Sequence, residues 1–504
     1  MKTAKSIVAV CCVLSLGWFA VFTLHWPFAG DSTLMHYVVF LTRHGMAPYR
    51  DIIELNTPCA YLVERGAMAV YGESALGWRL FDFTLLAVTG LCYISILRPR
   101  YWEAGLFAAA LFATIHGQDG VMMQGQRDLQ VAVFQIAALA CLLRGLRTEP
   151  PTPRAPVRLF AFGLLGSLAV CVKPPAIFFL AAIIAWVILR PADRKVSLRA
   201  FLLPTLAGTA IPVLVSAFYI EHYHAFFDFW TTWRSLVAYH AQLDRKPLSF
   251  LLSHSLSPVM ALFALYVILL MLQRRRTQTL ADSLLAVSAV TGWLSYAIQG
   301  KGFPYQRYPF LIFLVPLMAS AIFAAFKSSF AAQWIARAAL VTGVVLILLF
   351  ARRSGTYSQA NPYKQMSEDL KTFGGNNPSG SLSGSVQCMD TIGGCIATLY
   401  ENQLVQSTGN FYDCYLMDEQ NPLAQDLRKR FEDQLLPNPP RAIIITDSAC
   451  YGEKRRFDKF STWPAFTNLL ADRYQLVTER NFTTPVRYWT RGEIPFDYRI
   501  YVRR

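Results

Sequence analysis

Long blocks of apolar residues constrain the fold of this chain more than any other feature. Each block has roughly the 17–23 residues that an α-helix needs to cross a hydrocarbon core of about 30 Å. Hydrophobic residues make up 54% of the 504 residues. The sequence therefore predicts a mostly α-helical, polytopic membrane protein. Eleven spans are expected, at residues 6–27, 76–97, 103–117, 129–146, 157–172, 175–190, 200–220, 250–272, 280–299, 308–326 and 333–351.

Lysine and arginine residues near the ends of these blocks predict the topology. Lys2 and Lys5 precede the first block, which is too long for a cleaved signal peptide. Alternate short loops are basic, with Arg98, Arg100, Arg147, Arg154, Arg194, Lys195, Arg199 and Arg274–Arg276. The positive-inside rule then predicts a cytoplasmic N-terminus and an extracytoplasmic C-terminal part in a plasma (inner) membrane. Basic cytoplasmic loops account for the net charge of +15, which therefore does not indicate a nucleic-acid partner.

The chain changes character after the last apolar block. Residues 1–351 are expected to form the transmembrane domain, 352–384 a linker, and 385–504 an extracytoplasmic domain. Strand-like runs at 441–446 and 498–502 alternate with helix-like stretches at 422–435 and 463–473, which predicts a small α/β domain. Its cysteines, expected on the oxidising side, predict two disulfides, with buried thiols as the alternative. Four cysteines permit three pairings among Cys388, Cys395, Cys414 and Cys450.

The first outer loop, residues 28–75, is the longest between spans. Leu34, Tyr37, Val38 and Leu41 repeat at helical spacing, and a rougher pattern follows at 61–70, which predicts two amphipathic helices lying in the membrane interface. Asp31 precedes the first of them. It is read either as the N-cap of a helix starting at Ser32 or as a catalytic base held at the membrane surface.

The order of residues in this loop resembles the first outer loop of the GT-C membrane glycosyltransferases. Within them it is most similar to the family 39 branch of dolichyl-phosphate-mannose–protein mannosyltransferases and bacterial aminoarabinose transferases. The resemblance covers the membrane part, and in the loop it rests on Asp31, Tyr37, Gly45, Pro48, Tyr49, Arg50, Asp51, Pro58, Tyr61 and Leu62.

This resemblance implies a GT-C fold and a glycosyltransferase activity. The enzyme would move a hexose or pentose from a polyprenyl-phosphate donor to a glycan, lipid or protein acceptor on the outer face of the membrane. Asp31 matches the acid that acts as base or orients the acceptor, and direct displacement would invert the anomeric carbon. One departure stands out: many relatives carry Lys-Pro-Pro where this chain has Asn56-Thr57-Pro58, so the donor phosphate needs another cation.

Further polar residues fall on the same side of the membrane by topology. Donor phosphate binding is expected from cations, since charge builds on the leaving group; structural anchors or interfacial ion pairs are the alternative. Gln306 stands where relatives have histidine. The cation candidates are Lys301, Arg307, Arg127 and Lys173; the second acids or acceptor ligands are Asp128, Asp51 and Glu54; the substrate-lining aromatics are Tyr37, Tyr49 and Tyr305.

Neither a cofactor nor a metal site is predicted. His222, His224 and His240 lack acid ligands at a regular spacing, which makes them a weak metal signal. A divalent metal stays open but unsupported. The competing function is a polytopic transporter or a flippase of lipid-linked glycans without transferase activity. That class explains the many spans, but it predicts repeat symmetry between halves that the sequence does not show.

Overall fold

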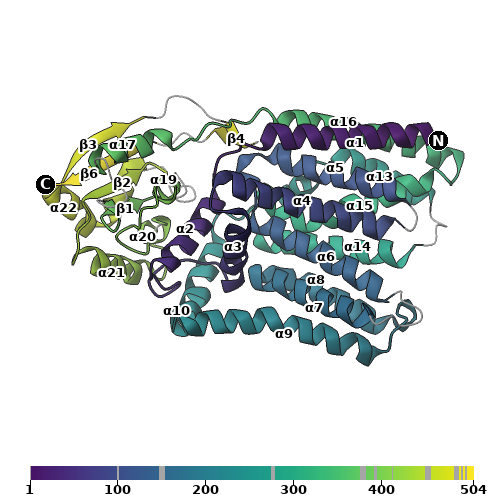
Figure 1. The fold of residues 1–504 in the computed structure, drawn as a ribbon, viewed down its shortest axis with the longest axis horizontal. Helices are drawn as coiled ribbons and strands as arrows, with labels where there is room; N and C mark the ends of the chain where they lie inside the picture. The colour runs from purple at the N-terminus through teal and green to yellow at the C-terminus, as the bar shows by residue number, and fades with distance from the viewer. Residues whose placement is uncertain are drawn as a thin grey trace.

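The computed structural model describes residues 2–98, 101–146, 154–273, 278–374, 382–390, 394–410, 412–448, 456–481, 487–489, 492–493 and 497–504. It consists of a bundle of roughly parallel helices with an α/β part seated on one end (Figure 1). The N-terminus lies at the other end of the bundle. The two ends of the chain are therefore separated along the helix direction.

All eleven predicted apolar segments are helical. The bundle is built from α1 (Lys2–Thr23), α4 (Ala75–Leu97), α5 (Trp102–Asp119), α6 (Arg127–Leu146), α7 (Arg154–Val172), α8 (Ile177–Leu189), α9 (Leu198–His222), α12 (Leu248–Leu256), α13 (Met260–Leu272), α14 (Leu280–Gln299), α15 (Tyr308–Ala325) and α16 (Phe330–Ser354). Short 3-10 turns are η1 (Val121–Met123), η2 (Pro174–Ala176), η3 (Pro191–Asp193) and η5 (Pro304–Arg307).

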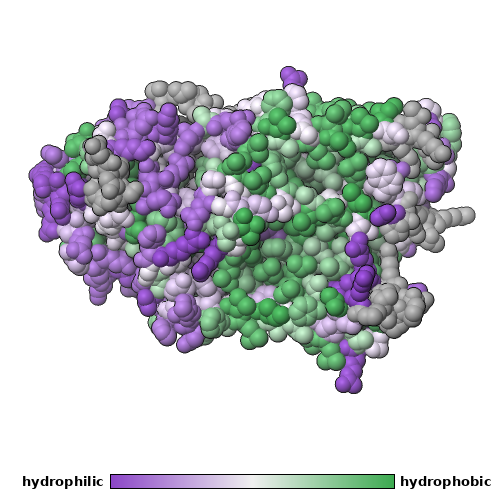
Figure 2. Space-filling model, in the orientation of Figure 1, coloured by the Kyte–Doolittle hydropathy of each residue, from purple (hydrophilic) through white to green (hydrophobic). Residues whose placement is uncertain are grey.

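The expected count of eleven spans is not confirmed. Among the described residues, eight helices are long and apolar enough to cross a membrane. The pair α12 and α13 adds a ninth if it is counted as one span, although it bends by 87°. Pro258 lies at this break, where a proline removes a helical hydrogen bond. The chain is a multi-pass membrane protein, and apolar side chains cover the visible face of the bundle (Figure 2).

The first outer loop contains both predicted helices, α2 (Asp31–Arg43) and α3 (Pro58–Tyr71). Helix α3 keeps one exposed side, as an amphipathic helix does. Helix α2 differs, because its residues from Ser32 to Leu41 are all buried. The loop after α9 forms α10 (Phe226–Thr231), the π-helical η4 (Thr232–Val237) and α11 (Ala238–Gln242). These elements all lie at the end of the bundle that carries the α/β part.

The C-terminal part has the predicted α/β character. Its main sheet has the order β1-β2-β6-β3, with β1 parallel to β2 and the other pairs antiparallel. The predicted strands and helices are present as β2, β6, α21 and α22. The elements are β1 (Val386–Met389), α19 (Cys395–Glu401), α20 (Cys414–Met417), α21 (Ala424–Leu435), β2 (Ala442–Thr446), η6 (Arg456–Thr462), α22 (Pro464–Arg473), β3 (Tyr474–Arg480), β4 (Arg487–Trp489), β5 (Gly492–Glu493) and β6 (Tyr498–Arg503).

Two predictions about this region need comment. The segment expected to be a linker contains helix α17 (Lys364–Gly374), because Met366 and Leu370 give it an apolar face that packs into the core. A disulfide joins Cys388 at the end of β1 to Cys395 at the start of α19. Cys414 is also disulfide-bonded, and Cys450 lies outside the described residues.

One apolar core joins the first outer loop to the C-terminal part. It contains Leu34, Val38 and Leu41 of α2 together with Val386 of β1 and Ile444 of β2. Hydrogen bonds reinforce it: the Tyr37 hydroxyl donates to Leu404 O at 2.9 Å and accepts from Gln406 N at 2.9 Å. Burial of this apolar surface holds the α/β part against the first outer loop.

Candidate active site

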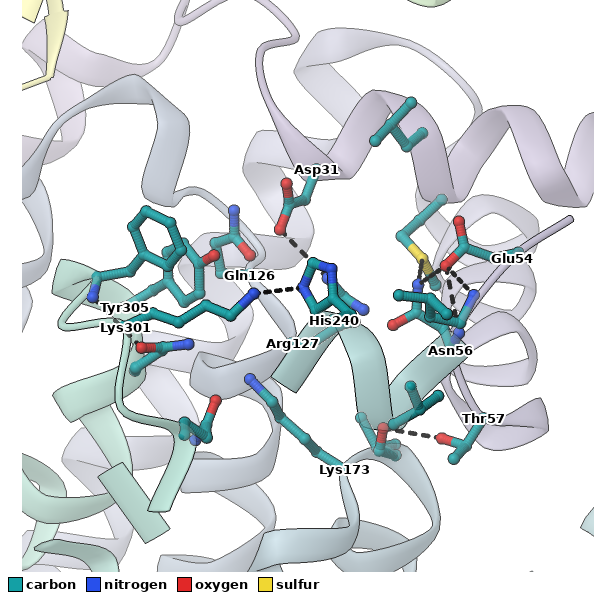
Figure 3. Close-up of a pocket in the computed structure, with 18 of the residues that line it drawn as sticks. Asp31, Glu54, Asn56, Thr57, Gln126, Arg127, Lys173, His240, Lys301 and Tyr305 are labelled. Atoms are coloured by element: carbon teal, nitrogen blue, oxygen red, sulfur yellow. Dashed lines mark hydrogen bonds and ion pairs between the residues drawn. The ribbon is translucent and has the colours of Figure 1, made fainter. Parts of the chain in front are cut away.

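A cavity of about 520 Å³ lies between the bundle and the α/β part. Residues from many parts of the chain line it, the first at the start of α2 and the last in α20. Polar groups converge on it while methionines, prolines and aromatic rings form much of the rest (Figure 3). Of the predicted site residues, it contains Asp31, Glu54, Arg127, Lys173, Lys301 and Tyr305.

Asp31 enters the cavity from the first turn of α2. Gly30 precedes the helix with φ of 70°, and a Cβ there would lie 2.8 Å from the Met122 methyl carbon, so this sharp turn favours glycine. Of the two alternatives for Asp31, the N-cap role is wrong: the helix begins at Asp31, Gly30 is the N-cap residue, and no side-chain hydrogen bond caps the helix. The Asp31 carboxylate instead pairs with Arg127, with 3.2 Å between Oδ2 and Nη2.

A buried ion network holds the loop that carries Arg127. The Gly125 amide donates to Asp82 Oδ1 at 2.7 Å, and the other oxygen of Asp82 pairs with Arg79 and with His116 Nε2. Asp82, Arg79 and His116 are fully buried within the bundle. Charges this deep in a membrane protein are costly unless they are paired, and here they are paired. The network therefore fixes the backbone just before α6, and so it positions Arg127, the first residue of that helix.

Glu54 contributes a second acid to the cavity wall. Its Oε1 accepts from the Leu55 amide at 2.7 Å and the Asn56 amide at 3.2 Å, and it also contacts the Asn56 side-chain amide. Burial raises the pKa of the Glu54 carboxyl above its ordinary value. Asp31 and Glu54 therefore face the same space in different electrostatic settings, one paired with arginine and one held by backbone amides.

Lys173 brings a cation to the cavity at the turn between α7 and η2. Its Nζ lies 2.5 Å from Asp128 Oδ2 and 5.9 Å from the centre of the Tyr305 ring. Burial is the main cause that lowers the pKa of Lys173, although Asp128 opposes it. Asp128 itself is 2% exposed and does not line the cavity. Asp128, which was predicted as a second acid of the site, therefore holds Lys173 in place from outside the cavity wall.

Lys301 is the third cation, and it meets an unpredicted partner. Its Nζ lies 2.7 Å from His240 Nε2, and His240 Nδ1 lies 2.9 Å from the Tyr415 hydroxyl. Burial and the nearby Lys173 lower the pKa of Lys301 to about 8. Burial and Lys301 lower the pKa of His240 to about 3. At neutral pH the ammonium is therefore protonated and the imidazole is neutral.

Four predicted site residues have other contacts. Arg307 binds Asp119 through two hydrogen bonds of 2.6 and 2.9 Å, and it does not line the cavity. Asp51 pairs with the neighbouring Arg50, Tyr37 serves the contact with the α/β part, and the Tyr49 hydroxyl donates to Asn56 O at 2.6 Å. These residues build the surroundings of the cavity rather than its wall.

Sequence reasoning missed several residues of the cavity wall. His240 was weighed only as a metal ligand, and Gln126, Tyr412 and Tyr415 were not singled out. The nearest signal in the sequence was the aromatic loop at 221–248, which supplies Trp233 and His240. Within the described residues, no group of three or more His, Cys, Asp or Glu side chains is arranged to hold a metal ion.

A second, more apolar cavity of about 700 Å³ adjoins the first. The two share Thr57 and Pro174 in their walls. The second is lined by parts of α7, α9 and α10, including Leu214, Phe218 and Phe226. An apolar cavity thus lies next to the polar one, beside the helices α7 and α9.

Solved structures of other proteins share this architecture, although no sequence match was found. No protein-family model matches the sequence, and no curated protein matches it. The structure is similar to that of ArnT from Cupriavidus metallidurans bound to undecaprenyl phosphate, with a TM-score of 0.59 and 11% identity over 99% of this chain and 98% of that one.

It is also similar to the archaeal oligosaccharyltransferase AglB from Archaeoglobus fulgidus in complex with an inhibitory peptide and a dolichol-phosphate. That TM-score is 0.55, with 11% identity over 97% of this chain and 74% of the other. Both are GT-C membrane glycosyltransferases. The fold that the first outer loop implied is therefore confirmed over nearly the whole chain: this protein has the GT-C fold.

Proposed function

We propose that this protein transfers a sugar from a polyprenyl-phosphate donor to an acceptor at the outer face of the membrane. The observation that carries the proposal is the cavity, which brings an acid, Asp31, together with three cations, Arg127, Lys173 and Lys301. The solved structures with this fold support it, because ArnT was crystallised with undecaprenyl phosphate and AglB with a dolichol-phosphate. The transferred sugar is a hexose or pentose, and the acceptor is a glycan, a lipid or a protein.

The cations suit a phosphate leaving group. Negative charge gathers on the departing oxygen in the transition state, and fixed donors in a site shielded from water stabilise it strongly. The first outer loop lacks the lysine that relatives place before Pro58. Thr57 Oγ1 donates to Val172 O at 2.9 Å, so this part of the loop lies against the segment that ends in Lys173. Lys173 thereby supplies a cation beside the position that lacks one.

The reaction is a single displacement. The acceptor oxygen or nitrogen forms a bond to the anomeric carbon as the bond from that carbon to the phosphate oxygen breaks. The electron pair leaves with the phosphate, and the acceptor proton passes to Asp31 or to water that Asp31 orients. One displacement inverts the anomeric carbon. The apolar cavity along α7 and α9 accommodates lipid, where each buried methylene is favourable.

The position of the cavity also supports the predicted orientation of the chain in the membrane. The cavity and the α/β part lie at one end of the bundle, and the N-terminus lies at the other (Figure 1). With the basic loops on the cytoplasmic side, the site faces the periplasm or its equivalent in the plasma membrane. The disulfide between Cys388 and Cys395 suits that compartment.

A donor-consumption assay tests the function. The purified protein would be incubated in detergent with a panel of polyprenyl-phosphate sugars, alongside Asp31→Asn and a control, Asp228→Asn, whose acid lies on α10 outside the cavity wall. We expect wild type and the control to consume one donor, if only by slow hydrolysis, and Asp31→Asn to consume it about two to four orders of magnitude more slowly. A folded wild type that consumes no donor would favour the transporter or flippase. A fully active Asp31→Asn would overturn the role of Asp31.

A further inference from the structure

His240 lies between the α/β part and the cation Lys301. It belongs to α11, and successive residues of that helix contact α20 or the residue after it: Tyr239 hydrogen-bonds to the Asp418 carboxylate, and His240 lies 2.9 Å from the Tyr415 hydroxyl. The other ring nitrogen of His240 lies 2.7 Å from Lys301 Nζ. One side chain thus spans the distance between two parts of the chain that are far apart in sequence.

The chemistry of the two partners determines the state of the imidazole. A lysine ammonium can only donate hydrogen bonds, so His240 Nε2 must accept from it. A neutral imidazole then carries its proton on Nδ1 and donates it to the Tyr415 oxygen. A protonated His240 would place a second cation 2.7 Å from Lys301, which the close contact disfavours. The lysine therefore selects the tautomer, and the Tyr415 hydroxyl, which can donate or accept, accepts the hydrogen bond from Nδ1.

Lys301 needs such a partner because its own segment is built from flexible residues. Gly300 and Gly302 flank it, both with positive φ, at 71° and 68°. Lys301 is 5% exposed as a residue. The α11 region also holds this segment through its backbone, because Lys246 N donates to Gly300 O at 2.7 Å. The loop that follows α9 therefore positions both the backbone of residues 300–302 and the side chain of Lys301.

We propose that His240 is a positioning residue that aims the Lys301 ammonium at the phosphate of the bound lipid, and that Tyr415 orients the imidazole by holding its other ring nitrogen. This inference rests on the proposed function only in taking the anion to be a polyprenyl phosphate. It makes the α/β part a component of the phosphate site. A shift of α20 relative to the bundle would move Tyr415, then His240, and so change the hold on Lys301.

Other charges face these groups and must be considered in any pH experiment. Lys173, Asp244 and Asp31 act on Lys301. Lys301, Arg127 and Lys173 act on His240. Burial lowers the pKa of Lys301 to about 8 and that of His240 to about 3, and it also lowers the pKa of Lys173. Both lysines can contribute to the alkaline limb of phosphate binding, and a shift of that limb in a His240 variant reports on Lys301, the lysine that His240 contacts.

The test measures binding of undecaprenyl monophosphate to the full-length protein in detergent, without sugar transfer. We expect His240→Leu to weaken binding about tenfold, as loss of one charged hydrogen bond implies, and to move the alkaline limb to lower pH. His240→Gln restores both, since an amide oxygen accepts the same hydrogen bond. Tyr415→Phe gives an intermediate loss. His222→Leu, on the exposed end of α9, leaves binding unchanged.

A double-mutant cycle separates positioning from a general structural role. In a Lys301→Gln background, His240→Leu should cause no further loss of binding, because its effect passes through the lysine. Additive losses, or an alkaline limb that does not move in the folded His240→Leu protein, would overturn the inference. Because binding is measured rather than transfer, a protein that binds the lipid without consuming any donor would sink the proposed function and leave this inference standing.

Discussion

The Arg127 guanidinium and the Asp31 carboxylate form an ion pair with 3.2 Å between Nη2 and Oδ2, and it joins the start of α6 to the start of α2. Both side chains are about one-fifth exposed to the cavity. The pair holds the acid in one orientation while leaving it accessible to an acceptor. Its two members come from segments separated by 96 residues.

Replacing Asp31 by asparagine tests this acid by kinetics. We expect Asp31→Asn to lower kcat by about two to four orders of magnitude, the usual contribution of a positioned acid or base. The melting temperature should change little, because a partly exposed ion pair contributes roughly 0–1 kcal/mol to stability. A large loss of stability in Asp31→Asn, with activity retained in the folded fraction, would mean that the pair serves the fold alone.

The lowered pKa of Lys301, about 8, predicts opposite effects of pH on activity and stability. Activity should fall above pH 8 as the ammonium loses its proton. Stability should rise between pH 8 and the unfolded value of 10.5, because there the unfolded chain binds more protons than the folded one. Initial rates and melting temperatures across pH 7–10.5 test this, with Lys301→Gln losing both trends. A rate independent of pH up to 10 would contradict it.

Arg307 should serve the fold and not the donor phosphate. Arg307→Gln leaves Asp119 buried without the guanidinium nitrogen that donates to both of its oxygens, which costs about 3–5 kcal/mol of stability. The folded fraction should bind undecaprenyl phosphate as wild type does. Lys301→Gln is the matched comparison, with the reverse pattern of weak binding and near-normal stability. Thermal unfolding and lipid binding of both variants would decide between the two roles.

The disulfide between Cys388 and Cys395 should stabilise the sheet beneath α19. It closes a loop of seven residues in sequence, for which chain entropy predicts about 2 kcal/mol. Replacing both cysteines by alanine should speed deuterium exchange in β1 and in its parallel neighbour β2. Exchange unchanged in both strands would show that the link adds nothing to this sheet. Peptide mass spectrometry without reduction checks the linkage itself.

The sequence by itself determined the helices, and its basic loops predict the side of the membrane on which each loop lies. Apolar blocks of spanning length admit little else, since in lipid every backbone polar group must be paired internally. It also made Asp31, Lys173 and Lys301 candidates, Asp31 through the resemblance of the first outer loop and the two lysines through the outer side that the predicted topology gives them. The α/β character of the C-terminal part followed from short apolar strands such as β2 and β6.

Only the tertiary structure decided which of those charges face the cavity. Charge counting assigns a residue to a side of the membrane but gives no direction to its side chain. Asp128 and Arg307 therefore looked like ligands, yet they pair with Lys173 and Asp119. Likewise, His240 meets Lys301 and Tyr415 through contacts that join residues 61 and 175 positions apart. Such contacts arise when apolar burial docks the α/β part on α2, and no local pattern in the chain records them.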